Sequence, residues 1–113
     1  MPHDPRAWLW DVQEAAAAIA EFTAGMDAAA YREHHLVRAA VERKFEIIGE
    51  ALNQLSKHAP DLAERITDRR QIIGFRNLLI HGYAEVDHRM VWGVVRAKVE
   101  PSLAEVGRLM SDT

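Results

Sequence analysis

Apolar side chains recur at intervals of three and four residues along most of this 113-residue chain. The first such run contains Trp8, Val12, Ala15, Ala16, Ile19 and Phe22. An α-helix has about 3.6 residues per turn, so this spacing is that of a helix with one buried face. Alanine, which has the highest helix propensity, supplies 18 residues, and no stretch alternates at every second position as a strand would. The pattern predicts an all-α fold.

Local start and stop signals place the first two long helices. Asp4 is a good N-cap and Pro5 fits a first helical turn, so the first helix begins there and ends near Gly25. After a short connection, the second helix runs from about 33 to 57. Its stripe comprises Leu36, Ala40, Val41, Ile47, Ile48, Ala51, Leu52 and Leu55. Gly49 lies inside this stripe and costs up to about 1 kcal/mol relative to alanine, so we expect another helix to pack closely there.

Further signals place a short helix and a third long one. Pro60 begins a short helical turn over 61–66. Asp68, followed three residues later by Gln71, has the form of a capping box. The third helix therefore begins there and ends near His81, because Gly82 follows. Its apolar residues are Ile72, Ile73, Phe75, Leu78, Leu79 and Ile80.

A fourth long helix completes the predicted architecture. Asp87 is a good N-cap for it, and Pro101 inside it should kink the helix or end it early. Its stripe comprises Val91, Val95, Val99, Leu103, Val106 and Met110. We therefore expect one domain over 1–113, an antiparallel four-helix bundle with a short extra helix between the second and third helices.

Composition excludes several classes of site and location. The chain has no cysteine, which excludes disulfides, cysteine-ligated zinc and thiol catalysis. No window approaches the ~18 uninterrupted apolar residues of a membrane span, and the N-terminus lacks the layout of a signal peptide. We therefore expect a cytoplasmic protein with no membrane contact. The formal net charge is −3, so any contact with nucleic acid would need a local basic patch.

The segment 74–83 places polar side chains within the most apolar part of the chain. In an ideal helix Arg76 and His81 lie about 140° apart around the axis and about 7.5 Å apart along it, so they would not stack directly. His81 sits at the helix end and arginine is long, so both can still reach one groove. An arginine fork binds phosphate oxygens, and histidine exchanges protons near neutral pH. This pair suffices for metal-free phosphoryl transfer, but a lone arginine and histidine in a helix usually make structural hydrogen bonds or face solvent, and spacing alone favours that interpretation.

The order of these residues is also that of a known motif. Arg76, His81 and Tyr83 form an R-x4-H-x-Y pattern, with Asn77 directly after the arginine. The pattern resembles the HEPN superfamily and, within it, the HepT-like toxins. The segment EIIGEA at 46–51 is similar to that family's second helix. The segments 73–83, 86–87 and 91–92 also follow the family pattern, so the similarity covers nearly the whole chain.

This resemblance implies the toxin of a toxin–antitoxin pair. It implies a metal-independent endoribonuclease in which the 2′-hydroxyl of RNA is the nucleophile, and a homodimer whose two motifs face a shared cleft. Arg76 would hold the scissile phosphate, His81 would act as general acid or base, and Asn77 would orient them. Glu50 of the second helix would brace Arg76 or simply be solvated. Transfer RNA and messenger RNA both remain open as substrates.

The resemblance also implies a protein partner. That partner is a minimal (MNT-type) nucleotidyltransferase antitoxin, which would use ATP to attach AMP to Tyr83. The chain itself would need no cofactor. An adenylate two residues from His81 would add bulk and negative charge to the cleft, which is a physical reason for it to silence the site.

Other residues have less specific interpretations. His81 and His88 with Glu85 and Asp87 are the best candidates for a metal site, but the two acidic residues fit loop and cap positions, so we expect no metal. The tryptophans Trp8, Trp10 and Trp92 are suited either to the core or an interface, which we favour, or to stacking nucleobases. Three further arginines, Arg65, Arg69 and Arg70, suit an RNA backbone and an exposed helix face equally. We expect His34, His35 and His58 to lie at the surface.

A second class of function keeps the fold without the catalysis. In it, a HEPN-type bundle docks a nucleotidyltransferase or presents that enzyme's substrate. A pure docking module has no need for both Arg76 and His81, so their presence argues against this class. Cleavage of RNA by the isolated chain would separate the two.

Overall fold

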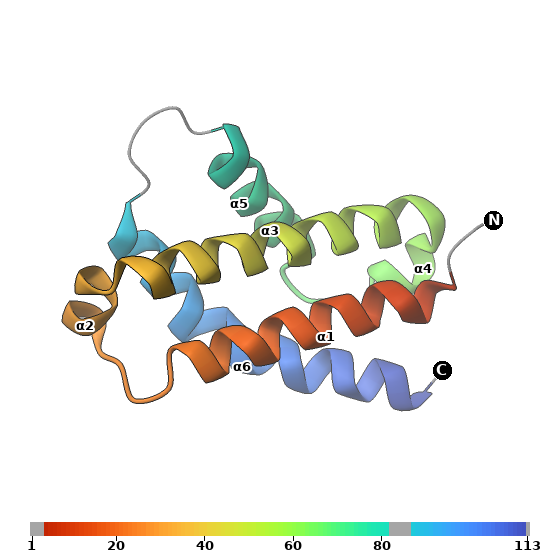
Figure 1. Cartoon of the computed structure of the whole chain (residues 1–113). Coiled ribbons are helices and arrows are strands. Elements are labelled where there is room, and N and C mark those ends of the chain that lie inside the picture. The colour runs from red at the N-terminus through yellow and green to blue at the C-terminus, as the bar shows by residue number, and fades with distance from the viewer. Residues whose placement is uncertain (1–3, 82–86, 113) are drawn as a thin grey trace.

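The computed structural model describes residues 4–81 and 87–112 (Figure 1). Its helices are α1 (Pro5–Phe22), α2 (Ala28–Glu33), α3 (His35–His58), α4 (Pro60–Ala63), α5 (Arg69–His81) and α6 (His88–Asp112). The described residues contain no strand, which confirms the all-α prediction. Over the same ranges, no helix combines the length and the apolar character needed to cross a membrane.

Three long helices form the body of the molecule. α1 packs against both α3 and α6 and runs in the opposite direction to each of them (Figure 1). α5 packs mainly on α3 and projects from the body, while α4 also packs on α3 and lies between α3 and α5 in sequence. The antiparallel helical bundle and the short helix before the motif helix are therefore confirmed.

The beginning of α1 follows from its capping residues. The Asp4 carboxylate accepts a hydrogen bond from the backbone N–H of Arg6 at 2.9 Å, and Pro5 is the first helical residue, as predicted. The helix ends at Phe22, slightly before the expected stop. Gly25 then turns the chain with φ of 76°, a left-handed conformation that glycine adopts without strain.

The connection expected after the first helix is itself helical, which corrects the sequence prediction. Asp27 caps α2, and its carboxylate accepts a hydrogen bond from the backbone N–H of Ala30 at 2.8 Å. Three consecutive alanines follow this cap, so the segment has both a start signal and a high helix propensity. The short helix carries Tyr31 into the core, where its side chain is fully buried.

Two features of the second half also differ from expectation. An early end at Pro101 is wrong, because α6 continues through it to Asp112. Asp68 precedes α5 as expected, but its carboxylate accepts a hydrogen bond from Lys98 Nζ of α6 at 2.6 Å, so it links two helices in place of the expected capping box. Its φ of 63° turns the chain into α5.

The core lies where the inward faces of α1, α3 and α6 meet. Its most completely buried side chains are Leu9, Val12, Ile19, Tyr31, Val41, Leu52, Leu55, Val91 and Val106. Phe75 carries α5 into this core and packs edge-to-face on Phe45 of α3, with ring centroids 5.2 Å apart. Leu36 was expected in the buried stripe, but it is 73% exposed, because it lies in the first turn of α3 beyond the packed region.

Burial of Tyr31 makes the free energy of unfolding depend on pH. Burial raises the pKa of its hydroxyl from 10.0 to about 12, with a smaller contribution from the Glu42 carboxylate that Arg38 opposes. The hydroxyl is also buried without a hydrogen-bond partner among the described residues.

We expect the natural protein to lose stability relative to Tyr31→Phe as the pH rises from 10 to 12. Over that range the unfolded tyrosine releases its proton while the folded one keeps it, so unfolding becomes more favourable by up to about 3 kcal/mol. Urea denaturation of both proteins at intervals between pH 8 and 12 measures the difference, in which the other titrating groups cancel. Parallel stability curves for the two proteins would contradict this expectation.

Candidate active site on helix α5

The position of Arg76 depends on a glycine in the facing helix. α5 approaches α3 so closely that a Cβ atom built on Gly49 would lie 2.2 Å from Cβ and 2.5 Å from Cγ of Arg76. Real Cβ atoms do not tolerate such contacts, so only glycine fits at this point of α3. The close helix packing expected at Gly49 is therefore confirmed, and its partner is the motif arginine.

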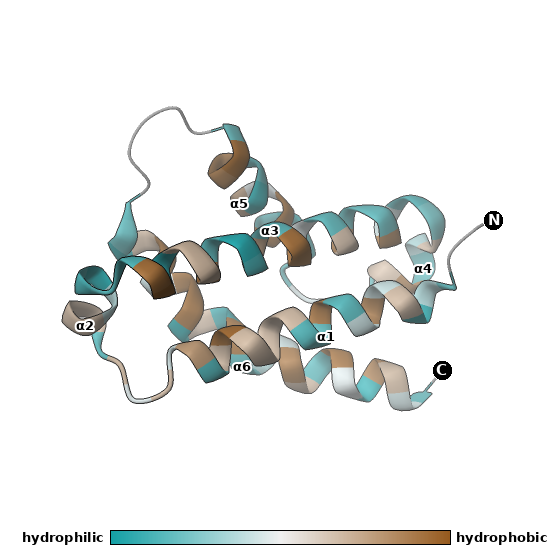
Figure 2. Ribbon diagram, in the orientation of Figure 1, coloured by the Kyte–Doolittle hydropathy of each residue, from teal (hydrophilic) through white to brown (hydrophobic). Residues whose placement is uncertain are grey.

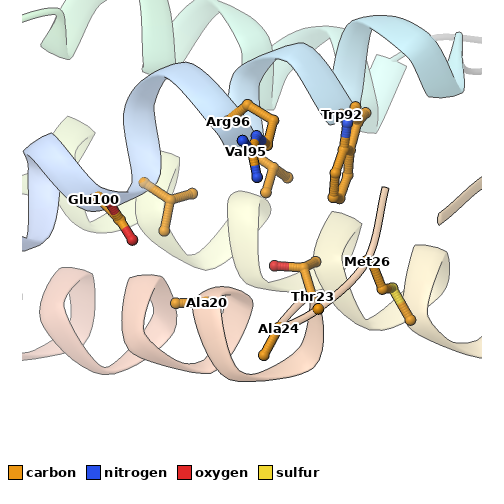
Figure 3. A pocket seen from close by; sticks show the side chains of 10 residues that line it. Ala20, Thr23, Ala24, Met26, Trp92, Val95, Arg96 and Glu100 are labelled. Atoms are coloured by element: carbon orange, nitrogen blue, oxygen red, sulfur yellow. The ribbon is translucent and has the colours of Figure 1, made fainter. Parts of the chain in front are cut away.

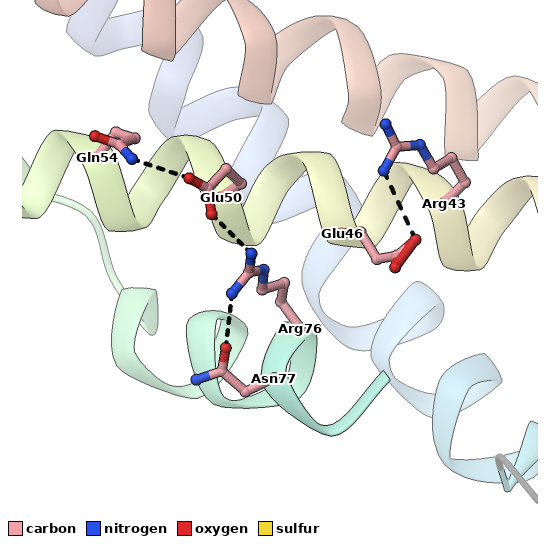
Figure 4. Close-up of polar contacts among 6 residues, drawn as sticks. All are labelled: Arg43, Glu46, Glu50, Gln54, Arg76 and Asn77. Carbon is pink, nitrogen blue, oxygen red and sulfur yellow. Dashed lines mark hydrogen bonds and ion pairs between the residues drawn. The ribbon is translucent and has the colours of Figure 1, made fainter. Parts of the chain in front are cut away.

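A chain of hydrogen bonds then orients the arginine side chain (Figure 4). Gln54 Nε2 donates to Glu50 Oε1 at 2.9 Å, and Arg76 Nη2 donates to Glu50 Oε2 at 2.8 Å. Arg76 Nη1 donates to Asn77 Oδ1 at 2.9 Å. Glu50 therefore braces Arg76 by an ion pair across two helices, which is one of the two interpretations that the sequence left open.

The guanidinium of Arg76 lies between the core and solvent. Its side chain is 22% exposed, against 46% for Glu50, and its Nε is buried with no partner among the described residues. The bonds to Glu50 and Asn77 use one N–H on each terminal nitrogen, so each nitrogen has a second N–H available. The site therefore offers a positioned pair of cationic donors that suits an anion such as phosphate.

The other motif residues lie at the end of α5. His81 is its last residue and is exposed, about 7.5 Å further along the helix axis than Arg76. Tyr83 lies outside the described residues.

The outer surface of α5 near this site is apolar. Leu78 is 50% exposed and Ile80 is 41% exposed, and hydrophobic residues colour parts of the α5 ribbon brown (Figure 2). Among the α5 residues only Ile72 and Phe75 are buried, because α5 packs mainly on α3. The motif helix therefore presents apolar side chains to solvent beside Asn77.

The remaining candidates fall outside this site. Across the described ranges, no group of three or more His, Asp or Glu side chains is placed to hold a metal ion. Glu85 lies outside those ranges, whereas Asp87 caps α6 as expected by accepting a hydrogen bond from the backbone N–H of Arg89 at 2.9 Å. His88 contacts Arg38 of α3 through its Nε2. The sequence offered no signal for this last contact, which joins residues 50 positions apart.

The tryptophans and the other basic residues divide between core and surface. Trp8 is buried and stacks on His58 with ring centroids 5.3 Å apart, whereas Trp10 is 52% exposed. Trp92 is partly buried against the ring of Tyr31. Arg65 pairs with Asp112 at 3.5 Å on the surface. His34, His35 and His58 are exposed, as expected, and so is Arg70, whereas Arg69 is half-buried.

Comparison with known proteins adds independent information. A family model described as ribonuclease HepT-like matches residues 12–109. An RNase candidate of Methanocaldococcus jannaschii, MJ1380, is 33% identical over 105 residues, which cover 91% of this chain and 94% of that protein. The probable ribonuclease HepT of Thermococcus cleftensis is 34% identical over 106 residues, which cover 91% of this chain and 92% of its own. No solved structure gives a significant match.

The contact at Gly49 makes a prediction about stability. We expect Gly49→Ala to lower the free energy of unfolding by about 1–3 kcal/mol, because the added methyl group overpacks the contact with Arg76. Gly74→Ala in α5 is the matched control, since its Cβ would meet nothing within 4 Å. The control should gain up to about 1 kcal/mol from helix propensity. Urea denaturation measures both, and equal gains in the two variants would contradict the close contact.

Proposed function

This chain belongs to the ribonuclease HepT-like family, and we propose that it is an endoribonuclease whose active site is built on α5 around Arg76 and His81. The observation that carries this proposal is the placement of Arg76. Glu50 and Asn77 hold its guanidinium with donors to spare, on the same helix as a solvent-accessible histidine. A purely structural arginine does not require a histidine at the exposed end of its helix.

The proposed reaction uses the RNA's own nucleophile. The 2′-oxygen beside the scissile phosphate loses a proton and attacks phosphorus, and the bond from phosphorus to the 5′-oxygen of the next nucleotide breaks. That 5′-oxygen takes up a proton, which leaves a 2′,3′-cyclic phosphate on one product. His81 accepts or donates one of these protons, and Arg76 stabilises the negative charge that develops on the phosphoryl oxygens. No metal or cofactor is needed in this scheme.

The proposal includes a homodimer. The reaction needs both a base and an acid, and α5 carries a single histidine. Two copies of α5 facing one cleft would supply one histidine for each role. The exposed apolar side chains of Leu78 and Ile80 support this arrangement, because pairing two such helices would remove them from water.

The proposal also includes a toxin role and its control. A cognate nucleotidyltransferase antitoxin would transfer AMP from ATP to Tyr83: the phenolic oxygen attacks the α-phosphorus, pyrophosphate leaves, and the phenolic proton passes to solvent. Tyr83 follows His81 by two residues, so the added adenylate would place a negative charge beside the RNA phosphate that Arg76 binds. Like charges would then exclude the substrate.

We expect Arg76→Ala and His81→Ala each to reduce RNA cleavage at least about 100-fold, because each removes charge stabilisation or proton transfer from the transition state. Cleavage of total RNA by the purified chain, with EDTA present, measures this through the yield of 2′,3′-cyclic phosphate ends. Arg43→Ala is the matched control, because the Arg43 side chain on α3 is 70% exposed and pairs with Glu46; this variant should cleave RNA normally.

Circular dichroism and light scattering on the same samples check folding and the expected dimer of the 12.8-kDa chain. Expression of the natural protein should arrest growth, and the two site variants should not. Equal background cleavage by all four well-folded proteins, free of AMP, would leave the ion pair of Arg76 as a structural brace. The docking module would then be the better assignment.

The proposed transfer of AMP to Tyr83 leads to a separate prediction. Co-expression with the cognate nucleotidyltransferase should add mass equal to whole AMP units and suppress cleavage, and Tyr83→Phe should prevent both. Tyr31→Phe is the control, because the chain's other tyrosine is fully buried and should not be modified. Intact-protein mass spectrometry measures the addition, and AMP on Tyr83→Phe would show that another residue is the acceptor.

A further inference from the structure

One groove contains no residue of α5 and is not used by the proposed reaction. It has a volume of about 600 Å³ and lies between α6 and the turn that follows α1 (Figure 3). Trp92 and Arg96 form its α6 wall, and Thr23 and Met26 lie opposite (Figure 3). A volume of this size suits one nucleotide-sized ligand.

Trp92 separates this groove from a second hollow of about 250 Å³. The second hollow is lined by Ala28, Ala29, Arg32, His88, Arg89 and Trp92. Arg89, Trp92 and Arg96 follow one another at intervals of three and four residues, so they share one face of α6. The two hollows therefore form one continuous strip with an aromatic ring at its centre and a cation on each side.

The cations on this strip are available to a ligand. The Arg96 guanidinium lies 6.0 Å from the centroid of the Trp92 ring, and of the carboxylates that the structure describes none pairs with Arg96 or Arg89. Arg32 pairs with Glu33 at 3.8 Å, but both side chains are largely exposed, so solvent weakens that pair. The residues that line the two hollows thus include three arginines and one carboxylate, on a chain whose net charge is −3.

Glu100 is the one negative residue among those lining the two hollows. It lies at the opposite end of the groove from Trp92 (Figure 3), about 12 Å further along the axis of α6. It follows Arg96 by four residues, about one helical turn, so its charge opposes an anion at Arg96 more than one between Arg89 and Trp92.

We propose that this strip, made by Arg32, Arg89, Trp92 and Arg96, is a second binding surface for single-stranded RNA. An unpaired base stacks on Trp92, and the phosphates on either side of it contact the arginines. Aromatic rings interleaved with cations are the usual means by which proteins hold single strands without reading their sequence. The inference rests on the proposed function, because it assumes that RNA is the substrate.

RNA fits this strip better than a protein partner does. A helix of another protein would need a run of exposed apolar side chains, but in the first groove Val95 and Val99 are buried, which leaves Met26 and two alanines beside Trp92. The strip is also joined to the proposed cleavage site on α5 by a short segment of chain. Seven peptide units join His81 to His88, so their Cα atoms are at most about 25 Å apart. One RNA strand can therefore touch both places.

Binding of RNA, measured without cleavage, tests this inference. All proteins carry His81→Ala, and the probe is a fluorescein-labelled 12-nucleotide oligo(A), followed by fluorescence anisotropy at several salt concentrations. We expect Arg89→Ala with Arg96→Ala to weaken binding at least about tenfold and to reduce the slope of log affinity against log salt by about 1.4, since each phosphate contact contributes about 0.7. Arg108→Ala, an exposed arginine of α6 outside the strip, is the matched control and should bind normally.

Two substitutions that resemble each other in size, one aromatic and one aliphatic, test the ring of Trp92. Trp92→Phe keeps an aromatic face and should retain most of the affinity, whereas Trp92→Leu should lose about 5- to 100-fold. Circular dichroism confirms that both remain folded. A 12-base-pair RNA duplex should bind less tightly than oligo(A) to the parent protein, because its bases are already stacked.

Several results would overturn the proposal. Unchanged binding in the double arginine variant, or equal weakening in Arg108→Ala, would remove the strip as a specific surface. Absence of oligo(A) binding by the parent at low salt would do the same. Variants that bind RNA normally but fail to bind the nucleotidyltransferase would assign the strip to a protein partner. Every sample lacks His81, so these outcomes are independent of whether the chain cleaves RNA.

Discussion

The contact between Gly49 and Arg76 determines where the motif helix can lie. Because glycine has no side chain, α5 approaches α3 closely enough for the aliphatic part of Arg76 to rest on the α3 backbone. That contact brings the guanidinium to Glu50, the next residue along α3, at 2.8 Å. A glycine–glutamate pair on one helix therefore sets both the position and the orientation of the arginine on another. Glycine lowers the helix propensity of α3, but it allows α5 to hold a cation beside Glu50.

The ion pair with Glu50 also affects what the site can bind. A half-buried guanidinium with no counter-charge would carry a desolvation cost, and Glu50 reduces it. The same carboxylate lowers the net positive charge that an anion meets. Binding therefore depends on the geometry of the remaining N–H groups and not on charge alone. Under the proposed function, such a site would favour a phosphate that arrives in the right orientation over anions in general, on a chain that carries a net negative charge.

Features of the fold that depend on strong local signals could be predicted from the sequence. The helical period, the caps at Asp4 and Asp87 and the packing role of Gly49 were all predictable, because each depends on a few neighbouring residues. The sequence prediction was wrong at α2, because it gave the three alanines after the capping aspartate as a connection and not as a helix. The apolar residues Leu78 and Ile80 are exposed, and periodicity could not predict this, because it identifies apolar residues but does not show whether another helix covers them. Contacts such as that of Arg38 with His88 join residues far apart in the sequence, so no local sequence pattern predicts them.

The attachment of α5 mainly to α3 has a consequence for its motion. α1, α3 and α6 share a core, whereas α5 contributes two buried side chains to it and exposes most of the others. The free energy needed to detach α5 is therefore smaller than that needed to unfold the bundle, and its amide protons should exchange with solvent sooner. A second protein that covers the outer face of α5 would suppress this opening. Binding of that second protein would then hold α5 against α3, so the residues of the proposed site would become rigid only in the complex.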